Sequence, residues 1–152
     1  MAQVQIRRCT EQDIDAVVAL ERQWEQEDIA YGDFNPMDAS MVRAVLERFP
    51  DYFFVAEHDG GLVGYVHGTL HRTTPSEVIP ADEPYLEIEN IYVQPEFRSQ
   101  DVGGALLEQL IDVAQSAGVQ RFVVGTRSKE IDRILRFYRS HGFQAWSIQF
   151  FR

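Results

Sequence analysis

The segment from Leu86 to Gly118 constrains the fold of this chain more than any other part of it. It reads LEIENIYVQPEFRSQDVGGALLEQLIDVAQSAG: a β-branched run that ends at Val-Gln-Pro-Glu, a short glycine-bearing turn, and an amphipathic helix. A strand that feeds such a turn into a helix N-terminus is suited to hold an anion. The N–H groups of the first helical turn have no acceptor, and the helix dipole adds partial positive charge there. The segment therefore predicts a ligand that carries phosphates.

The apolar periodicity and the turn residues predict the element order β-α-α-β-β-β-α-β-α-β. Strands are expected at 4–8, 52–57, 62–70, 85–93, 121–126 and 142–151. Helices are expected from an N-cap at Thr10 to Trp24, from Asp38 or Ser40 to before Pro50, at 102–117 with Gly118 as its stop, and at 130–140. This order implies an α/β fold in which helices cover both faces of a mixed sheet. The length of 152 residues favours one domain over 1–152.

Composition excludes several classes of partner. The net charge of −10 argues against nucleic acid, and no apolar run approaches the length of a membrane span. Cys9 is the only cysteine, so no internal disulfide can form, and a cytoplasmic setting is expected. Residues 1–90 hold 18 acidic and 6 basic residues, whereas residues 91–152 hold 6 acidic and 8 basic residues. The split favours a basic half for a polyphosphate and an acidic half for a cationic acceptor, or else a plain acidic surface.

The loop 95–105 carries neither the Gly-Lys-Ser/Thr of a Walker motif nor the G-x-G-x-x-G dinucleotide fingerprint. The stretch VQPEFRSQDVGGALLEQL resembles instead the acetyl-CoA signature of the GCN5-related N-acetyltransferases (GNAT), Arg/Gln-x-x-Gly-x-Gly/Ala. A second stretch, LRFYRSHGF at Leu135–Phe143, is similar to the Phe-Tyr-x-x-x-Gly-Phe ending of that family's penultimate helix. The resemblance implies a GNAT-like fold and an acetyl-CoA-dependent transferase that acetylates a primary amine, either a small cationic amine or a peptide N-terminus.

The resemblance also implies which residues bind the co-substrate. The strand residues would pair their backbone with the pantetheine arm, and the loop would cradle the pyrophosphate through its N–H groups. These residues are Ile91, Tyr92, Val93, Arg98, Ser99, Gln100, Asp101, Val102, Gly103 and Gly104.

Two positions depart from the family pattern. Asp101 replaces the central signature glycine, although aspartate tolerates a left-handed backbone better than most residues do. Ile131 stands where the family often has an asparagine that binds pantetheine. The signature can also be aligned so that it starts at Gln100. This alignment fits the residue pattern but places Glu108 and Gln109 where the helix should have apolar residues. These departures keep open an alternative reading, a non-catalytic GNAT-like module that binds or senses CoA.

The chemistry needs a base, because an alkyl amine is mostly protonated at neutral pH. Glu89 lies where several family members carry a glutamate base, and Glu87 is the second choice, with a role at the substrate. Tyr138 falls where the family often has a tyrosine that protonates the leaving thiolate, and Tyr31 lies in the region that often lines the acceptor site.

The histidines are scattered along the sequence without metal-ligand spacing, so no metal is expected. The expected partner is a small-molecule or peptide amine, with neither nucleic acid nor membrane, and a homodimer is one assembly open to the chain.

Overall fold

A five-stranded mixed sheet forms the centre of the protein. The structure is a computed structural model that describes residues 3–72 and 78–152. The strands are β1 (Gln5–Arg8), β2 (Phe53–His58), β3 (Gly61–His71), β4 (Tyr85–Val93) and β5 (Arg121–Val124). They follow this order across the sheet; β1 to β4 are antiparallel, and β5 runs parallel to β4.

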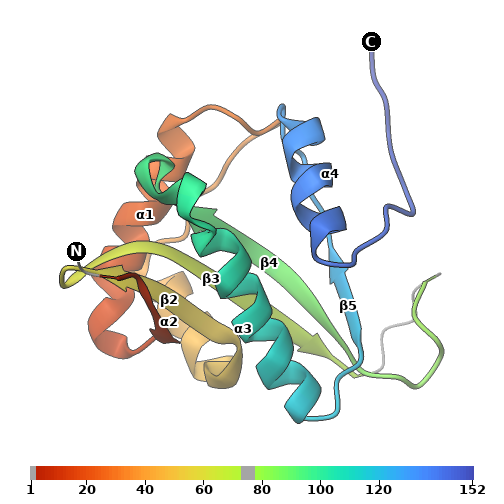
Figure 1. The fold of residues 1–152 in the computed structure, drawn as a ribbon, viewed down its shortest axis with the longest axis horizontal. Helices are drawn as coiled ribbons and strands as arrows, with labels where there is room; N and C mark the ends of the chain where they lie inside the picture. Colours follow the sequence, from red (N-terminus) through yellow and green to blue (C-terminus); the bar gives the residue numbers. More distant parts are fainter. Residues whose placement is uncertain (1–2, 73–77) are drawn as a thin grey trace.

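Helices cover both faces of the sheet, as predicted (Figure 1). On one face, α1 (Ile14–Gln26) and α2 (Ala39–Arg48) enclose a core that includes Val17, Val42 and Tyr65. On the other face, α3 (Val102–Ser116) fills a second core, and α4 (Ile131–Ser140) packs at its border through Phe137 and Tyr138. Short 3-10 turns at Glu11–Asp13, Pro50–Tyr52 and Pro95–Gln100 join these elements. No helix in the described part of the chain is long and apolar enough to cross a membrane.

The predicted order of elements is confirmed up to the end of α4, but the predicted last strand is wrong. Residues 143–152 form no strand, and in Figure 1 this C-terminal tail stands away from the sheet. A strand requires a neighbouring edge to satisfy its N–H and C=O groups, and none is paired with the tail in the ranges described. The sequence between β3 and β4, which its three prolines predict to be a loop, lies partly outside the described residues, since 73–77 are not among them.

Close packing of β3 on β4 depends on a glycine. A Cβ added at Gly64 would lie 2.7 Å from the carbonyl oxygen of Tyr92, a distance that real side chains do not reach. Gly64 pairs with Val93 at the end of β4. The absence of a side chain at this position therefore brings the end of β4 close to β3.

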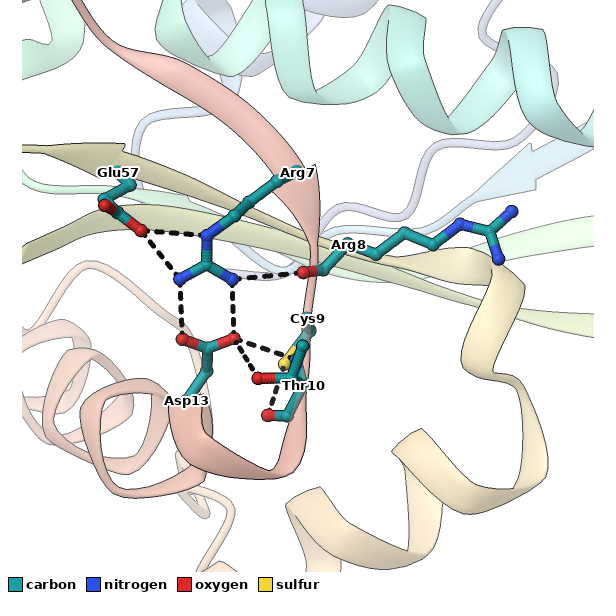
Figure 2. A network of polar contacts seen from close by, with 6 residues as sticks. All are labelled: Arg7, Arg8, Cys9, Thr10, Asp13 and Glu57. Carbon is teal, nitrogen blue, oxygen red and sulfur yellow. Dashed lines mark hydrogen bonds and ion pairs between the residues drawn. The ribbon is translucent and has the colours of Figure 1, made fainter.

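An arginine ties the first two strands to the start of α1 (Figure 2). The Arg7 guanidinium donates two hydrogen bonds of 2.8 Å to the Asp13 carboxylate, and its Nε donates a third, also 2.8 Å, to Glu57. Asp13 also accepts from the Thr10 backbone N–H at 2.8 Å, which closes the turn before α1. These bonds hold the pKa of Asp13 below its ordinary value, and the Arg7 hydrogen bond is the largest cause.

Replacement of Asp13 by asparagine is expected to lower the free energy of unfolding at neutral pH by about 1–3 kcal/mol, because a buried charge-assisted contact is lost. The folded-state pKa of Asp13 lies below the ordinary 3.8. Its contribution is therefore complete above pH 3.8 and is lost as the pH falls through the folded-state pKa. Urea unfolding at neutral pH and at successively lower pH measures the difference.

Asp51→Asn is the matched control, since the Arg8–Asp51 pair is exposed on both sides. This change is expected to cost less than about 0.5 kcal/mol. Equal losses in the two variants would contradict the special role of Asp13.

Candidate active site

The pairing between β4 and β5 ends halfway along β4. Residues Tyr85–Ile88 pair with Arg121–Val124, but no pair between the two strands follows. The rest of β4 therefore has an unpaired edge on that side. A cavity of about 450 Å³ lies beside this edge. It is lined by β4, by the start of α3, by residues 124–128 and by α4.

A β-bulge in β4 falls at the predicted base. His67 pairs with Asn90 while Gly68 pairs with Ile88, so Glu89 is the extra residue on its strand. A bulge bends a strand and redirects a side chain, and bulges are common beside functional sites. Glu89 lines the cavity.

A buried glutamate holds the strand just after this bulge. Glu21 of α1 is 1% exposed and accepts hydrogen bonds from the Asn90 amide at 3.1 Å and from the Met37 N–H at 2.9 Å. The Tyr65 hydroxyl also donates to it. Burial raises the pKa of Glu21. This network fixes α1, the segment before α2 and the middle of β4 with respect to one another.

Glu89 belongs to a cluster with Glu87 and His71. One imidazole nitrogen of His71 and one carboxylate oxygen from each glutamate lie within 4.8 Å of one another. His71 Nε2 is 2.9 Å from Glu87 Oε2. Partial desolvation raises the pKa of Glu89, the neighbouring Glu87 raises it further, and a hydrogen bond from Thr69 opposes the shift. Antiparallel pairing of β3 with β4 brings His71 beside the carboxylates, a proximity that its place in the sequence does not indicate. Such a group is compact enough for a metal ion, but exposed acidic groups commonly have this spacing without one.

Tyr138 lines the same cavity from the side of α4. Its ring makes edge contacts with Phe137 and Phe143, with centroids 5.1 and 5.4 Å away. Desolvation raises the pKa of its hydroxyl to about 12. The cavity therefore brings together a carboxylate of raised basicity and a phenol that keeps its proton at neutral pH.

The turn before α3 is left-handed at Asp101, the position where the sequence that this loop resembles has a glycine. Asp101 has φ 56° and ψ 28°, in the left-handed region, and α3 begins at the next residue. A Cβ at Gly104 would lie 2.2 Å from Asp101 Oδ1, so glycine at 104 leaves room for the carboxylate. Arg98 fixes the loop, because it donates to the Val93 carbonyl at 2.9 Å and to Glu27 at 2.8 Å.

The cavity gathers most of the predicted site residues but not all of them. Those that line it are Glu89, Ile91, Tyr92, Val93, Arg98, Asp101, Gly103, Gly104 and Tyr138. Those that do not are Ser99, Gln100, Val102, Glu87 and Tyr31. Val102 is buried in the core, and Tyr31 is 46% exposed and packs edge-on against Phe151. Ile131 is also exposed and outside the lining.

α1 and the loop after it form a further wall of the cavity. The sequence analysis expected the loop around Tyr31 and Phe34 at the acceptor site but did not single out Trp24 of α1. Trp24 and Phe34 line the cavity, and both also line a second cavity of about 420 Å³. Glu25, Asp28 and Asp33 line this second cavity as well. Across from them, Arg127 and Arg133 line the first cavity. The acidic run 25–33 was visible in the sequence, but nothing local indicated that it adjoins β4.

Comparison with known proteins gives the family. The model of the acetyltransferase (GNAT) family matches residues 14–143. An IAA acetyltransferase of Azospirillum brasilense is 31% identical over 131 residues, which cover 85% of this chain and 77% of that protein. An uncharacterized N-acetyltransferase of Methanocaldococcus jannaschii is 30% identical over 102 residues, 66% of this chain but 42% of that protein. The chain thus spans less than half the length of this second relative.

Solved structures share the fold. The aminoglycoside N-acetyltransferase AAC(6')-Iy, in complex with CoA, superposes with a TM-score of 0.76 at 20% identity and covers 100% of this chain and 95% of that one. The glucosamine-6-phosphate N-acetyltransferase of Arabidopsis thaliana gives 0.72 at 17% identity, over 99% and 97% of the two chains. The family match over residues 14–143 and the shared fold lead to one conclusion: this chain is a member of the GNAT family of acetyltransferases.

Proposed function

We propose that this protein transfers the acetyl group of acetyl-CoA directly to a primary amine. The observation that carries the proposal is that Glu89 and Tyr138 line one cavity together with the turn at Asp101. The free edge of β4 at Ile91–Val93 binds the pantetheine arm by backbone hydrogen bonds, as an added strand would. The N–H groups at the start of α3 receive the pyrophosphate.

The proton balance of the reaction involves these two side chains and the solvent, which carries the proton left on Glu89 back to Tyr138 before the next turnover. The amine nitrogen attacks the thioester carbonyl carbon, its proton passes to the Glu89 carboxylate, and a C–N bond forms. The C–S bond then breaks, and Tyr138 gives its proton to the thiolate of CoA. The raised pKa of Glu89 makes it a stronger base, while the pKa of about 12 keeps Tyr138 protonated before the thiolate leaves.

We further propose that the acceptor is a cationic amine. The second cavity shares Trp24, Ala30 and Phe34 with the first, so a molecule held in one can extend into the other. Its acidic side chains favour additional positive charges on the acceptor. Aminoglycosides and glucosamine phosphate are acceptors named for the structural neighbours, which share the fold with this chain.

Glu89→Gln and Tyr138→Phe are each expected to lower kcat by roughly 10²–10⁴-fold while CoA affinity stays nearly unchanged. The base must be unprotonated, so kcat/KM of the wild type should rise with pH through the raised pKa of Glu89. Thiol release from acetyl-CoA, followed across pH with a panel of amines, measures both effects.

Glu87→Gln provides the control for the pair of carboxylates. Removal of the neighbouring negative charge lowers the pKa of Glu89. The rise of kcat/KM with pH should therefore occur at lower pH, while kcat at high pH stays as in the wild type. If Glu89→Gln keeps the full rate with an unaltered pH profile, Glu89 is not the base.

Asp101→Gly and Asp101→Asn are both expected to tighten CoA binding by about 5–30-fold, which corresponds to roughly 1–2 kcal/mol of relieved repulsion. Both residues tolerate the left-handed backbone at this position, so the turn should persist. Calorimetric titration with CoA at constant ionic strength measures the change. Unchanged affinity in both variants would mean that the carboxylate does not face the pyrophosphate.

The cationic acceptor is tested with the double variant Glu25→Gln, Asp33→Asn. Its KM for a polyamine should rise by about 10-fold, because the electrostatic attraction between the acidic side chains and the cationic substrate is reduced. Added salt screens the same attraction and should raise the KM of the wild type likewise. A monoamine substrate and the Asp51→Asn variant serve as controls, and neither is expected to change KM. A neutral amine as the best acceptor, without salt dependence, would refute the assignment.

A further inference from the structure

One charged side chain of α1 lies in an otherwise apolar interface. The face that α1 turns to the sheet carries Ile14, Val17 and Leu20, and beside them Glu21 is 1% exposed. Burial of a carboxylate is costly unless charge-assisted hydrogen bonds compensate for it, and an apolar side chain would fill the same space without that cost. A carboxylate at this position therefore needs a reason other than packing.

The hydrogen bonds to Glu21 come from three separate parts of the chain. The N–H of Met37, just before α2, donates to Oε2 at 2.9 Å. The Tyr65 hydroxyl of β3 and the Asn90 amide of β4 both donate to Oε1, the amide at 3.1 Å. A carboxylate accepts all three bonds, whereas a protonated carboxyl accepts fewer of them because one oxygen carries a proton. The arrangement therefore fits the ionised form.

Asn90 is the residue that follows the bulge in β4. Because Glu89 is the extra residue of this strand, it has no cross-strand partner on β3. The direction of its side chain therefore depends on how the residues beside it are held. His67, which pairs with Asn90, is 4% exposed, and its ring nitrogens make no hydrogen bond within the described part of the chain. Of these two buried neighbours, Glu21 is the one that holds the bulge by a side-chain hydrogen bond.

We propose that Glu21 is a positioning residue for the transfer reaction: its carboxylate holds Asn90 so that the bulge directs Glu89 into the cavity, a role that rests on the proposed function of Glu89 as the base. Glu21 does not line the cavity, so it acts through β4. A displacement of about 1 Å at a reacting group can cost roughly 10²-fold in rate. Hydrogen bonds from a second layer of side chains prevent such a displacement.

The same carboxylate also fixes a wall of the cavity. Trp24 lies about one turn after Glu21 on α1 and lines the cavity. Met37, which is bonded to the other carboxylate oxygen, follows the loop that carries Phe34, another residue of this wall. One side chain thus sets the position of Glu89 relative to the aromatic residues of α1 and its loop. Loss of the Glu21 contacts should therefore lower turnover.

The first test removes the amide that joins the bulge to Glu21. Asn90→Leu keeps the approximate size of the side chain and should lower kcat by about 10–100-fold, while the Kd for CoA changes by less than about two-fold. Freed from its anchor, Glu89 turns more toward water and loses part of the desolvation that raises its pKa. The rise of kcat/KM with pH should therefore move to lower pH. Asn90→Ala deletes the same amide without adding bulk and should give the same results. Thiol release across pH and calorimetric titration with CoA measure these effects.

Val42→Ala is the matched control for stability. Val42 of α2 is fully buried in the core that α1 shares, and it makes none of the side-chain hydrogen bonds to Glu21. Its truncation should lower the unfolding temperature but leave kcat and the pH profile as in the wild type, when all variants are assayed below their unfolding midpoints. Equal losses of kcat in Val42→Ala and Asn90→Leu at equal loss of stability would show that Asn90 acts on stability alone, and the proposal would fail.

Glu21→Leu tests the carboxylate itself, because leucine fills the space without accepting a hydrogen bond. Its kcat should fall in the same range as that of Asn90→Leu. The double variant should be at most about three-fold slower than the slower single variant, because both changes break one contact. Losses that multiply would show that Glu21 acts by another route and would overturn the proposal.

A last measurement separates this proposal from the assignment of Glu89 as the base. In a Glu89→Gln background, Asn90→Leu should cause no further loss of kcat, because the group that it positions is already inactive. If Glu89→Gln loses activity while Asn90→Leu keeps the wild-type kcat and pH profile, the positioning role is wrong and the base stands. If Glu89→Gln itself keeps the full rate, the proposed function is wrong and the positioning role falls with it.

Discussion

The early end of the pairing between β4 and β5 is the constraint on which the site depends. Because β5 ends at Val124, opposite Ile88, the backbone of β4 continues with N–H and C=O groups that no strand pairs on that edge. Buried backbone groups require partners, so this edge is prepared for an extended ligand that can pair with it. The cavity, the loop at the start of α3 and α4 all surround this one gap. Close packing at Gly64 and the buried Glu21 keep β4 in place where β5 no longer supports it.

Local patterns were sufficient to predict most of the fold. Alternation predicted β4 to the residue, and helical periodicity with Gly118 as a stop predicted α3 within one residue. The tail shows where local reasoning fails. Its alternation is as regular as that of a true strand, but a strand exists only where a neighbouring edge accepts it. Alternation in a sequence indicates that a segment can form a strand, and whether it does depends on a neighbouring strand with a free edge.

The site was predictable to the extent that it lies in continuous segments. The signature loop could be read although Asp101 replaces a glycine, because aspartate also enters the left-handed region, and the backbone there does so with φ 56°. The cluster at Glu89 could be predicted from the sequence only in part. His71 precedes Glu87 by a long connection and reaches it only through the pairing of β3 with β4. The acidic second cavity is likewise a product of how α1 packs, and no spacing in residues 25–33 indicates it.

The two sides of the cavity differ in how firmly they are held. Glu89 lies on a central strand next to Asn90, which a buried glutamate anchors. Tyr138 lies on a helix without a fully buried residue, at the border of the sheet. Proton transfer depends steeply on geometry. The position of Tyr138, which is held less firmly than Glu89, therefore determines how often the acid and the base are both in place. Any contact that buries α4 and β5 further, such as that of a bound co-substrate, should therefore increase the fraction of time in which Tyr138 and Glu89 are both in position.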